Sequence, residues 1–284
     1  MSSRRNNSDE WDPDRARRVW GSLVAAVVVV VAMLIIAGTS RHPRGAPSPY
    51  APVQDPLPGP NPIDRLLAPG GPAARTDGIA VAVLVDVSGS MEDVVSDASG
   101  QRVPKIEIAR RSMVNLVAQA EQAAGKAPER KLRLGVYEFS RRDRQPSTRE
   151  VIPLGPPDAA AARRAVTGMR AEGGTPIGDA LLHAKRALDA TGLSREHILV
   201  ITDGENNAGY QPQDVVSAMG RQAEPDRAAV YFVAFDVAAA RFDAVRQAGG
   251  LVLSAADEKE LQQTLDLVLT GKILAEQPAV PGRP

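Results

Sequence analysis

The sequence contains no cysteine, which excludes disulfide bonds, thiol catalysis, cysteine-ligated zinc and a lipoprotein-type acylated cysteine. It also has no net charge, because 34 lysines and arginines balance 34 aspartates and glutamates. This balance favours neither a nucleic-acid partner nor a polyanionic tail, so any specificity must come from a local site. The cellular compartment stays open, since a domain of this size can bury a sufficient core without disulfides.

Several catalytic motifs are also missing. There is no Gly-x-x-x-x-Gly-Lys-Ser/Thr loop, no His-Glu-x-x-His and no Gly-x-Gly-x-x-Gly, which argues against ATP hydrolysis, zinc proteolysis and dinucleotide binding. The histidines are His42 in a Pro/Gly-rich stretch, His183 in a predicted helix and His197 just before a predicted strand, so none is an obvious catalytic base. A hydrolase nucleophile at Ser88 would need a glycine where the chain has Asp86. We therefore expect that the protein is not an enzyme, although catalysis by a bound Mg²⁺ ion alone stays open.

A long uncharged run lies near the N-terminus. Residues 19–40 carry no charge and are mostly Val, Ala, Leu, Ile and Met. About 20 such residues can cross the roughly 30 Å hydrocarbon core as a helix. Five arginines precede the run and two closely follow it, so the positive-inside rule places the N-terminus in the cytoplasm and the rest outside. The sequence predicts a single-pass protein of the cytoplasmic membrane, with signal-peptide cleavage and twin-arginine export as alternatives.

Composition divides the remaining chain. The stretch after the apolar run is crowded with proline and glycine and has no periodicity, which indicates an extended tether. The last residues have the composition of a frayed end. The predicted division is a cytoplasmic segment 1–18, a transmembrane helix 19–40, a tether 41–75, a folded domain 76–272 and a flexible tail 273–284.

Within the folded domain, short apolar runs alternate with amphipathic stretches. Most of the runs are continuously apolar, as strands covered on both faces are. The predicted strands are residues 79–85, 132–139, 198–201, 229–235 and 251–253, with a short edge strand at 151–154. The predicted helix faces are Ile106, Ala109, Met113, Leu116 and Ala120; Ile177, Leu181, Ala184 and Leu188; and Leu261, Leu265 and Val268, with a capping box at Asp257 and Glu260. This alternation predicts an α/β fold with a doubly wound, mostly parallel sheet and helices on both faces.

Polar side chains gather where predicted strands end or a helix begins. Asp86, Ser88 and Ser90 follow the first strand, Asp203 follows the strand at 198–201, and Thr175 precedes a helix. Ligands of such sheets bind beyond the carboxyl ends of the strands. Two carboxylates and three hydroxyls are hard oxygen donors that suit Mg²⁺ or Ca²⁺. The sequence therefore predicts a divalent-metal site that can accept a further anionic oxygen.

Each of these segments also has an ordinary explanation. Residues 86–90 could be a plain strand-to-helix loop, and Asp203-Gly204 is a common turn dipeptide. Thr175 has the form of an N-cap before Pro176 at the first helical position. These explanations do not account for the coincidence of all three segments on one rim.

Together the three segments resemble von Willebrand factor A domains, over residues 79–270. Asp86-Val87-Ser88-Gly89-Ser90 is similar to their DxSxS signature, and Thr175 and Asp203 are similar to residues of their second and third loops. The resemblance implies a Rossmann-like sheet whose first and fourth strands are neighbours. It also implies an intact metal-ion-dependent adhesion site, in which Ser88, Ser90 and Thr175 coordinate Mg²⁺, Mn²⁺ or Ca²⁺ directly or nearly so, and Asp86 and Asp203 bind it directly or through water.

The resemblance further implies a function. We expect a bacterial, membrane-anchored protein-binding module whose partner supplies an acidic side chain to the metal. An alternative is an accessory subunit of an envelope complex that works with an AAA-type ATPase. Glu92, Asp93 and Glu205 lie close in sequence but match no ligand position, and we interpret them as solvated rim charges.

Overall fold

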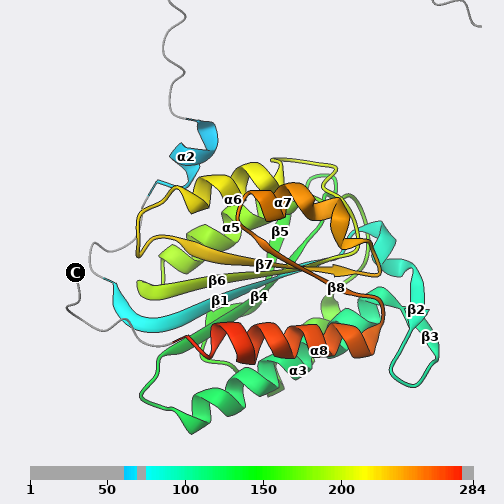
Figure 1. Cartoon of the computed structure of the whole chain (residues 1–284). Helices are drawn as coiled ribbons and strands as arrows, with labels where there is room; N and C mark the ends of the chain where they lie inside the picture. The colour runs from blue at the N-terminus through cyan, green and yellow to red at the C-terminus, as the bar shows by residue number, and fades with distance from the viewer. Residues whose placement is uncertain (1–60, 69–74, 277–284) are drawn as a thin grey trace, which may run out of the picture. The chain divides into compact units, whose positions relative to one another are not determined.

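The computed structural model describes residues 61–68 and 75–276 (Figure 1). All of them belong to one compact unit, residues 59–284. The predicted cytoplasmic segment 1–18 and membrane helix 19–40 lie outside the described residues. In the part of the chain that the structure covers, no helix is long and apolar enough to cross a bilayer.

One six-stranded sheet forms the centre of the domain, in the order β5-β4-β1-β6-β7-β8. All neighbouring strands pair in parallel except the edge pair β4 and β5, which is antiparallel. The strands are β1 (Thr76–Asp86), β4 (Leu132–Phe139), β5 (Thr148–Gly155), β6 (Leu193–Thr202), β7 (Ala228–Phe235) and β8 (Leu251–Ala255). The predicted mostly parallel sheet, with its edge strand near 151–154, is confirmed.

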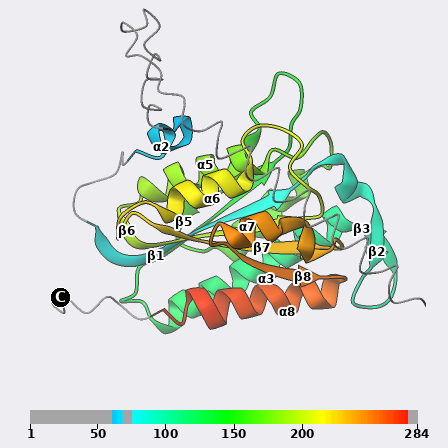
Figure 2. The ribbon, with the colours of Figure 1, turned by 45° about the horizontal axis from the view of Figure 1, so that its top comes forward.

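Helices cover both faces of this sheet, as Figures 1 and 2 show. The residues of β1 alternate between two cores: Val81 and Val83 pack with the helices of one face, and Ala82 and Leu84 with those of the other. The first face carries α3 (Lys105–Lys126), α4 (Ala159–Ala165) and α8 (Glu258–Val268), and the second carries α5 (Ile177–Asp189), α6 (Pro212–Gly220) and α7 (Asp243–Gln247). Because β1 is buried on both faces, it has to be continuously apolar.

The predicted apolar helix faces are all buried. Met113 in α3, Leu181 in α5 and Leu265 in α8 are completely shielded from solvent. The predicted capping-box-like start of α8 forms as well: the carboxylate of the N-cap Asp257 accepts from the Glu260 amide at 2.8 Å, and the Glu260 carboxylate accepts from the Ala256 amide, one residue before the N-cap, at 2.9 Å. Helical spacing alone therefore identified the packing surface of each long helix.

Some local structure differs from the expectation. Inside the range 41–75, expected to be extended, α2 (Pro62–Leu66) forms a short helix. Its N-cap Asn61 accepts from the Ile63 amide at 3.0 Å, and Ile63 is buried in the core on the α5 and α6 face. Five residues are too few to show helical periodicity, so only the Asn-Pro start could have signalled this helix.

The described chain also continues in ordered form past residue 272. The π-helical turn η4 (Leu269–Ile273) extends α8, and Ile273 is completely buried. Glu276 lies 3.0 Å from His197, measured between Oε2 and Nε2. The expected flexible tail therefore does not begin at residue 273.

A small hairpin was not anticipated. After the 3₁₀ turn η1 (Gly89–Glu92), the strands β2 (Val94–Ser96) and β3 (Arg102–Pro104) pair in antiparallel fashion before α3 begins. Three-residue strands on the surface lack the apolar run that identifies a buried strand, so apolar periodicity does not predict them.

The buried face of α8 provides a test of this packing. We expect Leu265→Ala to lower the free energy of unfolding by about 2–5 kcal/mol, because Leu265 is fully buried and the deletion leaves a cavity. The matched control is Leu267→Ala on the same helix, where the side chain is 54% exposed, and it should change stability by less than about 0.5 kcal/mol. Urea denaturation measures both, and equal effects would contradict the orientation of α8.

Candidate metal centre

The five predicted ligands converge at the carboxyl ends of β1 and β6. Asp86 is the last residue of β1, Asp203 directly follows β6, and these two strands are neighbours in the sheet. Ser90 Oγ donates to Asp203 Oδ1 at 2.8 Å and lies 3.2 Å from Ser88 Oγ. The first and third loops are therefore joined directly by side chains of the proposed site.

Thr175 borders the same group of oxygens. A Cβ added to Gly204 would lie 3.8 Å from both Ser90 Oγ and Thr175 Oγ1, so both hydroxyls flank the third loop. The alternative that Thr175 is an N-cap is not what the structure shows. The first amide of α5 at Ile177 is instead bound by Asn206 Oδ1 from the third loop, at 2.8 Å. The Thr175 hydroxyl is therefore not needed to begin the helix.

The second loop is held in place by its neighbours. The Gly89 amide donates to the Gly173 carbonyl at 2.9 Å, and the Thr175 amide donates to Asn207 Oδ1 at 2.7 Å. Gly173 has a φ of +85°, and a Cβ there would lie only 2.2 Å from the Arg141 carbonyl oxygen. Only glycine allows the loop to pass this close to the end of β4.

Asp86 is completely buried, and its environment disfavours its charge. Its Oδ2 accepts from Thr202 Oγ1 at 2.6 Å and its Oδ1 from the Ser88 amide at 2.8 Å. Burial raises the pKa of Asp86 to about 7; the hydrogen bonds from Thr202 and Ser88 oppose this rise, and the nearby charge of Asp203 adds to it. Without a cation the carboxyl is therefore largely protonated at mildly acidic pH.

Lys105 contributes a charge that the sequence did not reveal. Its ammonium lies 3.1 Å from Asp203 Oδ2 and 2.9 Å from Asp236 Oδ2, and the residue is only 4% exposed. Burial works against this charge, but the hydrogen bond with Asp236 and the charge of Asp203 outweigh it and raise the pKa of Lys105 above its ordinary value. Lys105 thus fixes one oxygen of Asp203 and leaves the other facing Ser90.

The donor set fits a hard divalent cation. In residues 61–68 and 75–276, no group of three or more His, Asp or Glu side chains is placed to hold a metal. A metal at this rim must therefore use hydroxyl oxygens as well as carboxylates, and Ser88, Ser90 and Thr175 supply them beside Asp86 and Asp203. Oxygen ligands of this kind suit Mg²⁺, Mn²⁺ or Ca²⁺.

The acidic residues next to the site belong to the solvated rim. Glu92, Asp93 and Glu205 are all exposed. The Glu205 carboxylate pairs with Arg241 at 2.9 Å. None of the three makes a hydrogen bond to the five predicted ligands.

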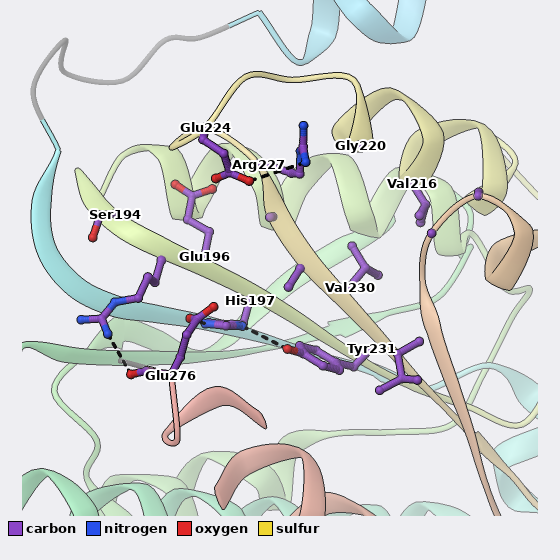
Figure 3. Close-up of a pocket in the computed structure, with 16 residues that line it drawn as sticks. Ser194, Glu196, His197, Val216, Gly220, Glu224, Arg227, Val230, Tyr231 and Glu276 are labelled. Carbon is purple, nitrogen blue, oxygen red and sulfur yellow. Dashed lines mark hydrogen bonds and ion pairs between the residues drawn. The ribbon is translucent and has the colours of Figure 1, made fainter. Parts of the chain in front are cut away.

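The two histidines within the described residues lie away from the rim. His197 is buried near the amino end of β6, beside a cavity of about 400 Å³, where Figure 3 shows it between Tyr231 and Glu276. Its Nδ1 lies 3.5 Å from the Tyr231 hydroxyl. His183 is exposed on α5 and packs edge-on against Tyr137, with ring centroids 5.4 Å apart. Neither imidazole is placed as a base for Ser88.

Comparison with known proteins decides the family. The family model for the von Willebrand factor type A domain matches residues 80–265, well over half of the chain. The chain belongs to this family. No curated protein matches its sequence.

Several solved structures share the fold of this von Willebrand factor A domain. The PilB minor pilin of Streptococcus sanguinis matches with a TM-score of 0.54 and 15% identity, over 70% of this chain and 62% of the pilin. BatB of Bacteroides thetaiotaomicron matches with a TM-score of 0.51 and 17% identity, over 68% of this chain and 98% of BatB. The pilus adhesin SpaC of Lactobacillus rhamnosus GG matches with a TM-score of 0.52 and 14% identity, over 70% of this chain and 31% of SpaC. The chain thus spans about three-fifths of the pilin and a third of the adhesin.

Because the pKa of Asp86 is raised, we expect any binding of a cation at this rim to depend on pH. Because the metal requires the carboxylate, the affinity for Mg²⁺ should fall about tenfold per pH unit below pH 7 and level off above it. The pKa of Asp86 rises from its ordinary value of 3.8, which applies to the unfolded chain, to about 7 in the folded protein. In metal-free protein, protonation of Asp86 therefore stabilises the fold fully below pH 3.8, and this stabilisation is lost as the pH rises to about 7. Calorimetric titration and urea denaturation across this range measure both effects. Metal-free Asp86→Asn should lack the stability change, and a Mg²⁺ affinity that is constant from pH 5 to 7 would contradict the assignment.

Proposed function

We propose that this von Willebrand factor A domain is a divalent-metal-dependent protein-binding module, for adhesion or scaffolding. The observation that carries the proposal is the hydrogen bond from Ser90 to Asp203, which joins the loops after β1 and β6 at one rim and leaves Thr175 beside them. Two carboxylates match the charge of one divalent ion, and neutral hydroxyls add no further negative charge. The bound ion can therefore accept an acidic side chain from a partner.

A binding role is favoured over an enzymatic one. A hydrolase needs a base near its nucleophile, and the buried His197 lies toward the amino end of β6, whereas Ser88 follows the carboxyl end of β1. Two of the solved structures with this fold are described as a minor pilin and a pilus adhesin, which supports adhesion as the kind of function proposed.

The metal ligands provide the direct test of this function. We expect Asp86→Ala and Asp203→Ala each to abolish Mg²⁺ binding and metal-dependent partner capture while the circular-dichroism spectrum stays unchanged, because neither apolar core contains any of the five predicted ligands. Thr175→Ala should weaken metal binding less, since a neutral hydroxyl attracts a divalent ion less than a carboxylate does. Calorimetry with Mg²⁺ and pull-down from solubilised membranes, with and without chelator, measure the two effects.

Two further outcomes sharpen this test. Ser88→Ala should behave as a metal-site variant and remove no hydrolytic activity. A partner that is still captured by Asp86→Ala and Asp203→Ala in chelator would show that recognition uses another surface.

We also propose that residues 19–40 anchor the chain in the cytoplasmic membrane with the domain outside, on the basis of the arginine asymmetry around this run. Protease added to spheroplasts should then cut within residues 42–60 and release the folded domain. Cleavage only after lysis would reverse this orientation. In that case a cytoplasmic AAA-type ATPase could reach the domain, and the accessory-subunit alternative would gain support.

A further inference from the structure

The rim around the proposed metal has an uneven distribution of charge. The loop 87–104 after β1 contains three acidic residues and one arginine, and the loop 203–211 after β6 contains two acidic residues and no basic one. The loop 140–147 after β4 contains three arginines and a single aspartate. Among the described loops at this edge of the sheet, it alone carries an excess of positive charge.

Arg141 connects this basic loop directly to the metal rim. Its amide donates to the Gly174 carbonyl at 2.8 Å, and its carbonyl accepts from the Gly174 amide at 3.1 Å. Gly174 directly precedes Thr175, so the backbone of Arg141 is fixed beside one of the predicted ligands. The Arg141 side chain is exposed and makes no hydrogen bond or ion pair with any described residue.

The other arginines of the loop differ in their contacts. The Arg142 side chain is already paired within the domain, because its guanidinium donates to the Arg170 carbonyl and lies 3.8 Å from Glu172. Arg144 is exposed and, within the described residues, has no side-chain partner. It also adopts a φ of +58°, a left-handed conformation that glycine or asparagine takes with less strain. Two guanidinium groups are thus presented to solvent, and the backbone of one of them, Arg141, is held by Gly174.

We propose that Arg141 and Arg144 form a second anchor for the partner, so that the partner is a segment with two acidic side chains rather than one. This inference rests on the proposed function: one carboxylate binds the metal and the second binds the loop 140–147. A second acid would be repelled by the loops after β1 and β6 and attracted only toward the loop after β4. Because the Arg141 backbone is already held by Gly174, little backbone ordering is required on binding.

The test uses synthetic peptides as probes and the full-length chain loaded with Mg²⁺. One peptide carries a single glutamate in a glycine and serine sequence. A series of further peptides carries two glutamates at increasing separation in the same kind of sequence. We expect one member of the two-glutamate series to bind more tightly than the single-glutamate peptide. Arg141→Ser and Arg144→Ser should each weaken that peptide by about two- to fivefold, the range of an exposed ion pair, and the advantage should shrink at high salt.

Controls separate the second anchor from the metal site. Neither substitution should change the affinity for Mg²⁺ or for the single-glutamate peptide. Arg133→Ser is the matched control. Arg133 is exposed and has no side-chain partner in the described chain, but it lies at the opposite end of the same strand, β4. This substitution should leave the affinity for both kinds of peptide unchanged.

The possible failures are distinguishable. If both kinds of peptide bind with equal affinity and only with Mg²⁺, or if Arg141→Ser weakens both equally, the second anchor is wrong while the proposed function stands. If neither peptide binds, or if both bind equally well in chelator, the metal-dependent function fails and the second anchor fails with it. Because Arg144 lies in an exposed turn, Arg144→Ser still tests the anchor if Arg141→Ser disturbs Gly174.

Discussion

The parallel pairing of β1 with β6 brings the two carboxylates of the rim together. Val85 lies opposite Ile201, so that Asp86 and Thr202 end neighbouring strands side by side, and Thr202 Oγ1 donates to Asp86 Oδ2 at 2.6 Å. Asp203 follows one residue later. If another strand lay between β1 and β6, the strands would be about 10 Å apart and no single ion could contact ligands from both.

Direct hydrogen bonds join the loops of the rim. Ser90 joins the first loop to Asp203, and Asn207 joins the third loop to the Thr175 amide. Lys105 balances part of the negative charge by pairing with Asp203 and Asp236. Val87 and Met91 of the first loop are buried in the core on the α3 and α8 face, so this loop is also attached to the fold by apolar packing.

The distribution of charge on the same rim favours one direction of approach for the proposed partner. The proposed metal site lies where β1 and β6 end, and the basic loop follows β4 on the other side of β1. Phe139 at the end of β4 pairs with Asp86, and the loop 140–147 that contains Arg141 begins at the next residue. With acidic loops after β1 and β6, a partner that carries more than one acid would approach along the side of β4. On the proposed function, the order of strands in the sheet therefore sets both the position of the ion site and the side from which an acidic segment would approach it.

The amino-acid sequence by itself determined the strands of the main sheet and the buried faces of α3, α5 and α8, because apolar periodicity is a local pattern. It also singled out Asp86, Ser88, Ser90, Thr175 and Asp203 as predicted ligands, because polar residues at strand ends can be read locally. The membrane helix at 19–40 stays a prediction, since it lies outside the described residues. Only the tertiary structure showed that Lys105 pairs with Asp203, that Asn206 rather than Thr175 caps α5, and that Arg141 is fixed to the second loop. These contacts join residues far apart in the chain, such as Lys105 and Asp203 at a separation of 98 residues. Spacing along one sequence cannot reveal them, because they depend on which strands the folded sheet makes neighbours.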